Sequence, residues 1–145
     1  DEDWEEYDNF HKSEFLIQTI DETMRLVPPA AISFSRRITK DIRLGEFKLK
    51  RGSEIIIPTV AIHNNEKYFK NPEQFIPERF SKENKRSIDK NSYMPFLNGR
   101  RNCIGKNLAE LMMRMLICNL MHRFEIKGTD REVIKVMKFS YGIDQ

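Results

Sequence analysis

Apolar residues recur at spacings of one, three and four between residues 13 and 26, which predicts a helix with one apolar face. Pro28 and Pro29 follow, and proline ends a helix because it lacks the N–H donor and restricts the residue before it. A longer pattern from Ile104 to His122 carries apolar residues around most of the helix circumference. We therefore expect this second helix to be largely buried.

Alternating apolar residues around Gly45 predict a β-hairpin over Ile42–Leu49. The β-branched run Glu54–Val60 predicts a strand that Pro58 confines to a sheet edge or ends. A short helical turn is expected at residues 61–63. Two closing strands are predicted near the end of the chain, at Phe124–Lys127 and Val133–Tyr141.

The composition is typical of one soluble globular domain: 145 residues, 39% of them apolar and 32% charged. The net charge of +3 is too small to indicate nucleic-acid binding. The chain has two cysteines and no C-x-x-C pair, which argues against a disulfide scaffold and against a structural zinc site. No apolar run is long enough to cross a bilayer.

The segment Pro95–Gly105, PFLNGRRNCIG, places Cys103 after a turn and two arginines and just before the second helix. Positive charge and the unpaired N–H groups of a helix start favour a thiolate. Gly105 leaves room for a flat group to approach the backbone. The alternative is a buried structural cysteine beside a turn, and on the cysteine alone that interpretation is favoured.

The wider pattern changes this balance. The residues Phe96, Gly99, Arg101, Cys103 and Gly105 fit F-x-x-G-x-R-x-C-x-G at every fixed position. This string closely resembles the haem-binding loop of the cytochrome P-450 family. The resemblance implies that Cys103 is the axial thiolate ligand of haem iron, that Arg101 pairs with a haem propionate, and that the cofactor is haem b. Phe96, Gly99 and Gly105 would belong to the same cofactor-binding loop, with Phe96 as an aromatic wall near the sulfur.

Two other strings resemble segments of the same family. Glu22 and Arg25 lie in ETMRLVPP, which is similar to the E-x-x-R helix, and Arg79 lies in NPEQFIPERF, which is similar to the P-E-R-F segment. The resemblance implies that these three residues form a buried polar network that anchors the cysteine loop. Taken alone, Glu22 and Arg25 are a generic i, i+3 ion pair, and the two prolines of the second string predict an irregular ordered loop.

Arg36 and His63 are candidates with two interpretations each. Arg36 lies at the spacing before Asp41 where the family often has an arginine on a haem propionate; the alternative is an exposed basic pair with Arg37. His63 could be a lone ligand, but a hydrogen-bonded structural histidine is the favoured interpretation. The family often continues after this histidine with Arg-Asp-Pro, which this chain lacks.

The resemblance covers nearly the whole chain. It implies a mainly α fold with small antiparallel β-sheets (α+β), in which residues 1–145 are the C-terminal, proximal haem-binding part of a single cytochrome P-450 domain. The N-terminal part with the distal helix would be absent. We therefore expect the 145-residue chain alone to be inactive.

The implied function is a haem-thiolate monooxygenase that inserts one oxygen atom from dioxygen into a small, lipophilic organic substrate. Electrons would come from an NADPH-dependent reductase type of protein on a basic face formed by the basic residues of segment 81–91 together with Arg100, Lys106 and Arg114. The implied location of the full-length protein is the endoplasmic reticulum membrane. No side chain is assigned as a catalytic residue.

Two alternative classes stay open. One is a haem-thiolate isomerase, dehydratase or peroxide-using enzyme that needs no electron donor. The other is a non-catalytic truncated fragment. A zinc enzyme or a cysteine hydrolase is a poor interpretation, because the ligands are too few and nothing in the sequence places a base beside Cys103.

Overall fold

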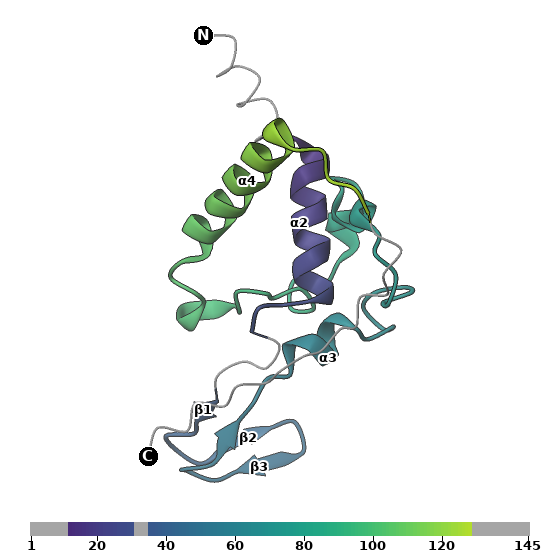
Figure 1. Ribbon diagram of the computed structural model, residues 1–145. Helices are drawn as coiled ribbons and strands as arrows, with labels where there is room; N and C mark the ends of the chain where they lie inside the picture. Colours follow the sequence, from purple (N-terminus) through teal and green to yellow (C-terminus); the bar gives the residue numbers. More distant parts are fainter. Residues whose placement is uncertain (1–11, 31–34, 129–145) are drawn as a thin grey trace.

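The computed structural model describes residues 12–30 and 35–128, and three helices dominate this part of the chain (Figure 1). The four short strands described there form two separate two-stranded sheets. This arrangement confirms the mainly α class with small antiparallel sheets. The elements are α2 (Glu14–Leu26), β1 (Arg36–Arg37), β2 (Ile42–Leu44), β3 (Phe47–Leu49), β4 (Glu54–Ile55), α3 (Thr59–His63), the 3-10 helices η1 (Pro77–Phe80), η2 (Asn84–Ser87) and η3 (Gly99–Arg101), and α4 (Lys106–Arg123).

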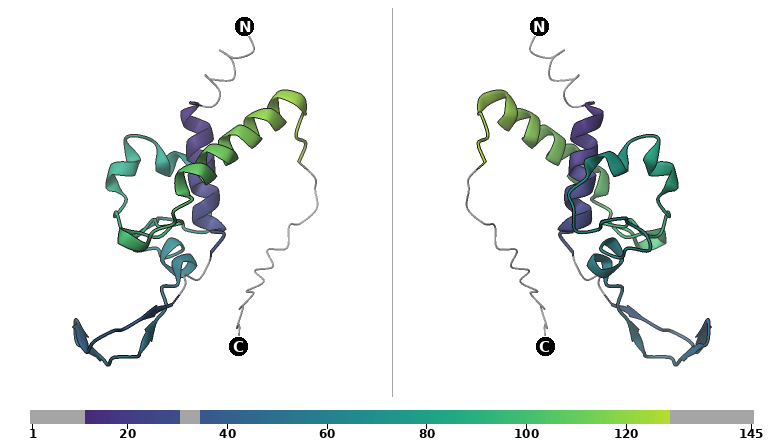
Figure 2. Two further views of the ribbon diagram at one scale, coloured as in Figure 1. Left: turned by 90° about the vertical axis from the view of Figure 1, so that its left-hand side faces the viewer. Right: turned by 90° about the vertical axis from the view of Figure 1, so that its right-hand side faces the viewer.

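Helix α2 is the centre of the arrangement, and it lies within the range predicted from the apolar pattern. It contacts η1, α3 and α4, so the helical elements gather around it (Figures 1 and 2). One face of α2 is buried against α4. The small apolar core between them consists of Leu16, Ile20, Met24 and Cys118, with Phe96, Met113 and Ile117 partly buried against it.

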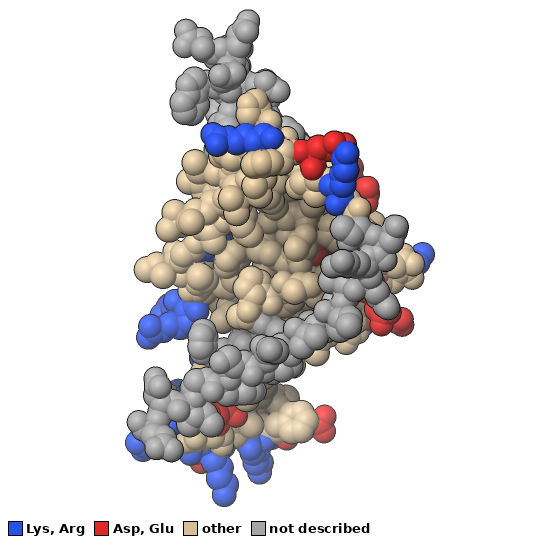
Figure 3. All heavy atoms as spheres, in the orientation of Figure 1, with Lys and Arg blue, Asp and Glu red and all other residues tan. Residues whose placement is uncertain are grey.

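Helix α4 exists as predicted, but the expectation that it is largely buried is wrong. Cys118 is its only buried residue. The described residues cover only the side of α4 that faces α2, and a helix with apolar residues all round needs more than one covering surface. The remaining apolar side chains form an exposed face that Figure 3 shows almost free of charge; it includes Leu108, Leu111, Met112, Met115, Leu116, Leu120 and Met121.

The predicted hairpin is confirmed. Strands β2 and β3 pair antiparallel with Ile42 opposite Leu49, and Gly45 in the connecting turn has a φ of +58°, which glycine adopts without strain. The hairpin is exposed and extends away from the helices (Figure 2). Strands β1 and β4 form the second antiparallel pair, with Arg36 opposite Ile55.

Three expectations about local structure need correction. The strand predicted over residues 54–60 is only two residues long, because Pro58 cannot continue a ladder and instead precedes α3. Residues 124–128 form no strand, since no strand among the described residues lies beside them to pair with. The segment around Pro77 is not fully irregular, because proline is compatible with the first position of the 3-10 helix η1. The strand predicted at residues 133–141 lies outside the described residues.

Among residues 12–30 and 35–128, no helix is both long enough and apolar enough to cross a bilayer.

Candidate functional site

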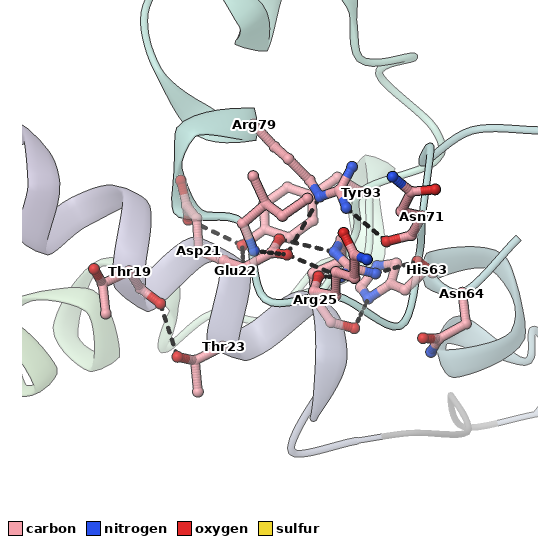
Figure 4. Close-up of polar contacts among 12 residues, drawn as sticks. Thr19, Asp21, Glu22, Thr23, Arg25, His63, Asn64, Asn71, Arg79 and Tyr93 are labelled. Carbon is pink, nitrogen blue, oxygen red and sulfur yellow. Dashed lines mark hydrogen bonds and ion pairs between the residues drawn. The ribbon is translucent and has the colours of Figure 1, made fainter. Parts of the chain in front are cut away.

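Glu22 and Arg25 form a buried, two-bond ion pair on α2 (Figure 4). The Nε atom of Arg25 lies 2.8 Å from Oε2 of Glu22, and its Nη2 atom lies 2.9 Å from Oε1. Both side chains are 0% exposed. The spacing of three residues places them on the same side of the helix, and the guanidinium fork matches the carboxylate geometry.

Arg79 and the backbone before it join the same carboxylate. The Nε atom of Arg79 lies 3.3 Å from Oε1 of Glu22, and the N–H of Ile76 donates to this oxygen at 2.9 Å. Arg79 also donates from Nη2 to the carbonyl oxygen of Asn71 at 2.7 Å. The structure therefore brings Glu22, Arg25 and Arg79 together, and their contacts attach η1 to α2.

The other donors of Arg25 bind two distant backbone carbonyls. Nη1 donates to His63 at 2.9 Å and Nη2 donates to Gln74 at 3.2 Å. The guanidinium carbon also lies 5.3 Å from the centre of the Phe69 ring. A buried cation is tolerated only when paired and hydrogen-bonded, and this one satisfies both conditions.

His63 is a buried structural histidine, as the favoured interpretation had it. Its Nδ1 lies 3.2 Å from the carbonyl oxygen of Arg25, and the N–H of Met94 donates to its Nε2 at 2.9 Å. Burial lowers the pKa of His63 to about 4, and the nearby Arg25 cation contributes in the same direction. The contact with Met94 was not predicted, because no local sequence pattern signals a bond between a ring nitrogen and a backbone N–H thirty-one residues away.

A second polar cluster was also missed. Tyr93 donates its hydroxyl to Oδ1 of Asp21 at 2.9 Å, and Nζ of Lys85 lies 2.9 Å from Oδ2 of the same carboxylate. Burial, followed by the charge of Asp21, raises the pKa of Tyr93, so this phenol stays a neutral donor. The cluster attaches the residues just before the cysteine loop to α2.

The loop of Cys103 is held by its backbone. The N–H of Cys103 donates to the carbonyl oxygen of Phe96 at 2.9 Å. Leu97 and Gly99 have left-handed φ values of +60° and +82°. Left-handed φ suits glycine but is strained for leucine. The cysteine itself is exposed, unlike the buried structural cysteine of the alternative interpretation.

Gly105 lies immediately before α4, with an unstrained φ of −85°. A Cβ atom added to it would lie 3.8 Å from the sulfur of Cys103, in ordinary van der Waals contact. The glycine therefore keeps one side of the sulfur open. The side chain of Phe96 packs against the core between α2 and α4, which secures the loop at its other end.

The two arginines expected to bind propionates lie near each other. Arg101 is exposed in η3, and Nη2 of Arg36 in β1 lies 3.5 Å from the carbonyl oxygen of Arg101. The exposed thiol of Cys103 thus lies two residues from Arg101, whose backbone oxygen is contacted by Arg36 from a separate segment. A thiol with arginines nearby can bind a metal centre that carries carboxylate groups.

Comparisons with known proteins identify the family of the chain. The model of the family described as Cytochrome P450 matches residues 3–143. Cytochrome P450 3A11 of Mus musculus is 40% identical over 83% of this chain and 24% of its own length. Cytochrome P450 3A5 of Homo sapiens is 40% identical over 96% of this chain and 27% of its own length. Cytochrome P450 9e2 of Blattella germanica is 38% identical over 90% of this chain and 25% of its own length.

The chain belongs to the cytochrome P450 family. It spans about a quarter of the length of the relatives it matches. The family implies haem, and the residues present fit that group. Cys103 has an exposed thiol, Ile104 beside it is a fully exposed apolar side chain, and Arg36 and Arg101 are exposed cations that would suit carboxylates.

Proposed function

We propose that this chain is the C-terminal, cysteine-bearing part of a haem-thiolate monooxygenase, with Cys103 as the axial ligand of haem b. The observation that carries this proposal is the exposed thiol of Cys103 on a hydrogen-bonded loop that fits the pattern of the family at every fixed position. A bound haem with a thiolate ligand supplies the activation of dioxygen that inserts one oxygen atom into a substrate.

The proposed roles of the surrounding residues follow from their positions. Arg36 and Arg101 neutralise the haem propionates, which are costly to bury without partners. Phe96 fixes the loop to the core, Gly99 permits its tight turn, and Gly105 keeps space beside the sulfur. The network of Glu22, Arg25 and Arg79 has a structural role: it holds the framework on which the loop rests.

We further propose that an acidic electron-donor protein, of the NADPH-dependent reductase type, docks on the cysteine side. Arg100 is exposed and Lys106 is half-exposed, with its Nζ 3.8 Å from Glu110. Arg114 is partly buried and donates to the backbone of Glu110, so it contributes less to the surface. Opposite charge speeds the encounter of two proteins. The proposed substrate is a small lipophilic molecule, and the proposed location is the endoplasmic reticulum membrane.

The decisive measurement is the absorption spectrum of the full-length protein with haem bound (the holoprotein), in its reduced, carbon monoxide-bound form. The wild type should show a main band shifted strongly to the red by the thiolate. Cys103→Ala should abolish this shifted band, because the sulfur ligand is gone. Cys118→Ala is the matched control, since it removes a buried thiol from the core and should leave the band in place. A shifted band that survives Cys103→Ala would reject the ligand assignment.

Turnover distinguishes the proposed oxygen insertion from other haem-thiolate reactions. Product formation by the holoprotein should require the reductase, NADPH and dioxygen together. Turnover that persists without the reductase and NADPH would instead assign the isomerase, dehydratase or peroxide-using class.

A further inference from the structure

Glu22, Arg25 and Arg79 form the buried ion cluster, and His63 connects this cluster to the cysteine loop. Its backbone oxygen accepts a hydrogen bond from Arg25, and its ring bonds the backbone of Arg25 on one side and that of Met94 on the other. The ring is 0% exposed, stacks on Tyr93 at 5.5 Å between centres, and meets Phe69 edge-on at 6.4 Å. Figure 4 shows His63 beside Arg25 and Tyr93 in this cluster.

The two backbone partners fix the chemical form of the ring. A backbone N–H can only donate, so Nε2 must present a lone pair to Met94. A carbonyl oxygen can only accept, so Nδ1 must carry the proton that faces Arg25. His63 is therefore a neutral imidazole with a single usable tautomer, in agreement with its lowered pKa.

Met94 is the residue from which the cysteine loop starts. Its carbonyl oxygen accepts the N–H of Leu97 at 3.0 Å, which closes the first turn of the loop. Two residues of the following stretch have left-handed φ values, and Phe96 then accepts the N–H of Cys103. A continuous set of hydrogen bonds thus leads from Arg25 through His63 and Met94 to the loop that carries the cysteine.

We propose that His63 is a positioning residue: by accepting the N–H of Met94 it holds the start of the cysteine loop and so sets how Cys103 presents its sulfur to haem iron. This inference rests on the proposed function of Cys103 as the iron ligand. Without the hydrogen bond to His63, Met94 would lose this link to the ion cluster, whereas Glu22 and Arg25 would remain paired with each other. The loop would then hold the thiolate less firmly, although the core persisted.

Two substitutions separate the two hydrogen bonds of the ring. His63→Gln places an amide oxygen near the position of Nε2 and can still accept the N–H of Met94. His63→Asn is shorter, reaches only the position of Nδ1, and keeps only the bond to the carbonyl oxygen of Arg25. We expect His63→Asn to raise amide hydrogen exchange at Met94 about tenfold, as for loss of one net hydrogen bond, and to increase the fraction of holoprotein without the red-shifted carbon monoxide band. His63→Gln should match the wild type in both measurements.

Two control variants separate positioning from general stability. Thr59→Val changes another buried residue of α3, whose hydroxyl has no hydrogen-bond partner among the described residues, and should leave both measurements unchanged. Phe69→Leu weakens the packing around the ring without removing either of its hydrogen bonds. If Phe69→Leu lowers stability as much as His63→Asn and shifts the spectrum equally, the proposal is overturned.

The positioning role would be rejected if His63→Asn left both the spectrum and the amide exchange of Met94 unchanged. It would also be rejected if a folded His63→Gln lost as much of the red-shifted band as His63→Asn. If His63→Asn yields no holoprotein, the retention expected for His63→Gln decides alone. Failure of the proposed function of Cys103 can be distinguished from failure of this inference. In that case the wild type itself would lack a red-shifted band that depends on Cys103. Slow amide exchange at Met94 would still report its bond to His63.

Discussion

The ion cluster on α2 and the cysteine loop are both polar features, yet the structure treats them in opposite ways. Around Glu22 and Arg25, side chains are fully buried and the donors reach partners from four different segments. Around Cys103, the backbone is held but the thiol and the neighbouring cations are exposed. The first region is complete within the described residues, whereas the second presents its chemistry outward.

The two regions should therefore respond differently to substitution. Changes in the ion cluster leave buried charge without a partner, so they should reduce the free energy of unfolding strongly. Changes in the loop should have small effects on stability and larger effects on what the sulfur binds. Matched pairs of variants in the holoprotein can test this contrast.

Glu22→Ala should have the largest effect. It would leave Arg25 buried without its carboxylate and would remove the acceptor of Arg79 and of the Ile76 N–H. Breaking one side of a buried ion pair costs about 3–5 kcal/mol. Urea unfolding should show this loss. Glu14→Ala is the control: Glu14 pairs with Lys82 at an exposed position, so its loss should cost less than about 1 kcal/mol. Similar losses in the two variants would contradict the contrast.

The titration of His63 should make stability depend on pH. The folded pKa of about 4 lies below the ordinary value of 6.5, so the unfolded chain binds more protons between these values. Stability is therefore fully present above pH 6.5 and falls as the pH drops toward 4, by a total on the order of 3 kcal/mol.

The comparison with His63→Gln isolates this effect from the carboxylates, because glutamine does not titrate. The difference in unfolding free energy between wild type and His63→Gln should change between pH 6.5 and pH 4, to the disadvantage of the wild type. A difference that stays constant over this range would show that His63 does not titrate as its buried, doubly bonded position requires.

Arg25→Lys should have an intermediate effect. A lysine ammonium can stay near Glu22, but one point charge cannot reproduce the fork that also reaches the carbonyl oxygens of His63 and Gln74. We expect a loss of about 2 kcal/mol in urea unfolding, from buried acceptors left without donors. Arg37→Lys is the control, because Arg37 pairs with Glu54 at an exposed position and should tolerate the change.

Sequence reasoning succeeded where a pattern is local or a string is distinctive. The apolar periodicity predicted α2, and the alternation around Gly45 predicted the hairpin. It failed for α4, because apolar residues around a helix indicate how much surface can be covered and not which segments cover it. The bond from His63 to Met94 joins residues thirty-one positions apart, and only the folded path of the chain places them together.

Two glycines of the cysteine loop offer the smallest and most specific test. Gly99 has a φ of +82° with open space around it, so Gly99→Ala adds backbone strain and no clash, for a cost of about 1 kcal/mol. Gly105→Ala adds no such strain, but its new methyl group would touch the sulfur of Cys103. Urea unfolding should therefore detect the first change, and the carbon monoxide spectrum should detect the second. If Gly105→Ala alters stability more than the spectrum, the open side of the sulfur serves packing within the chain and not the group that the cysteine binds.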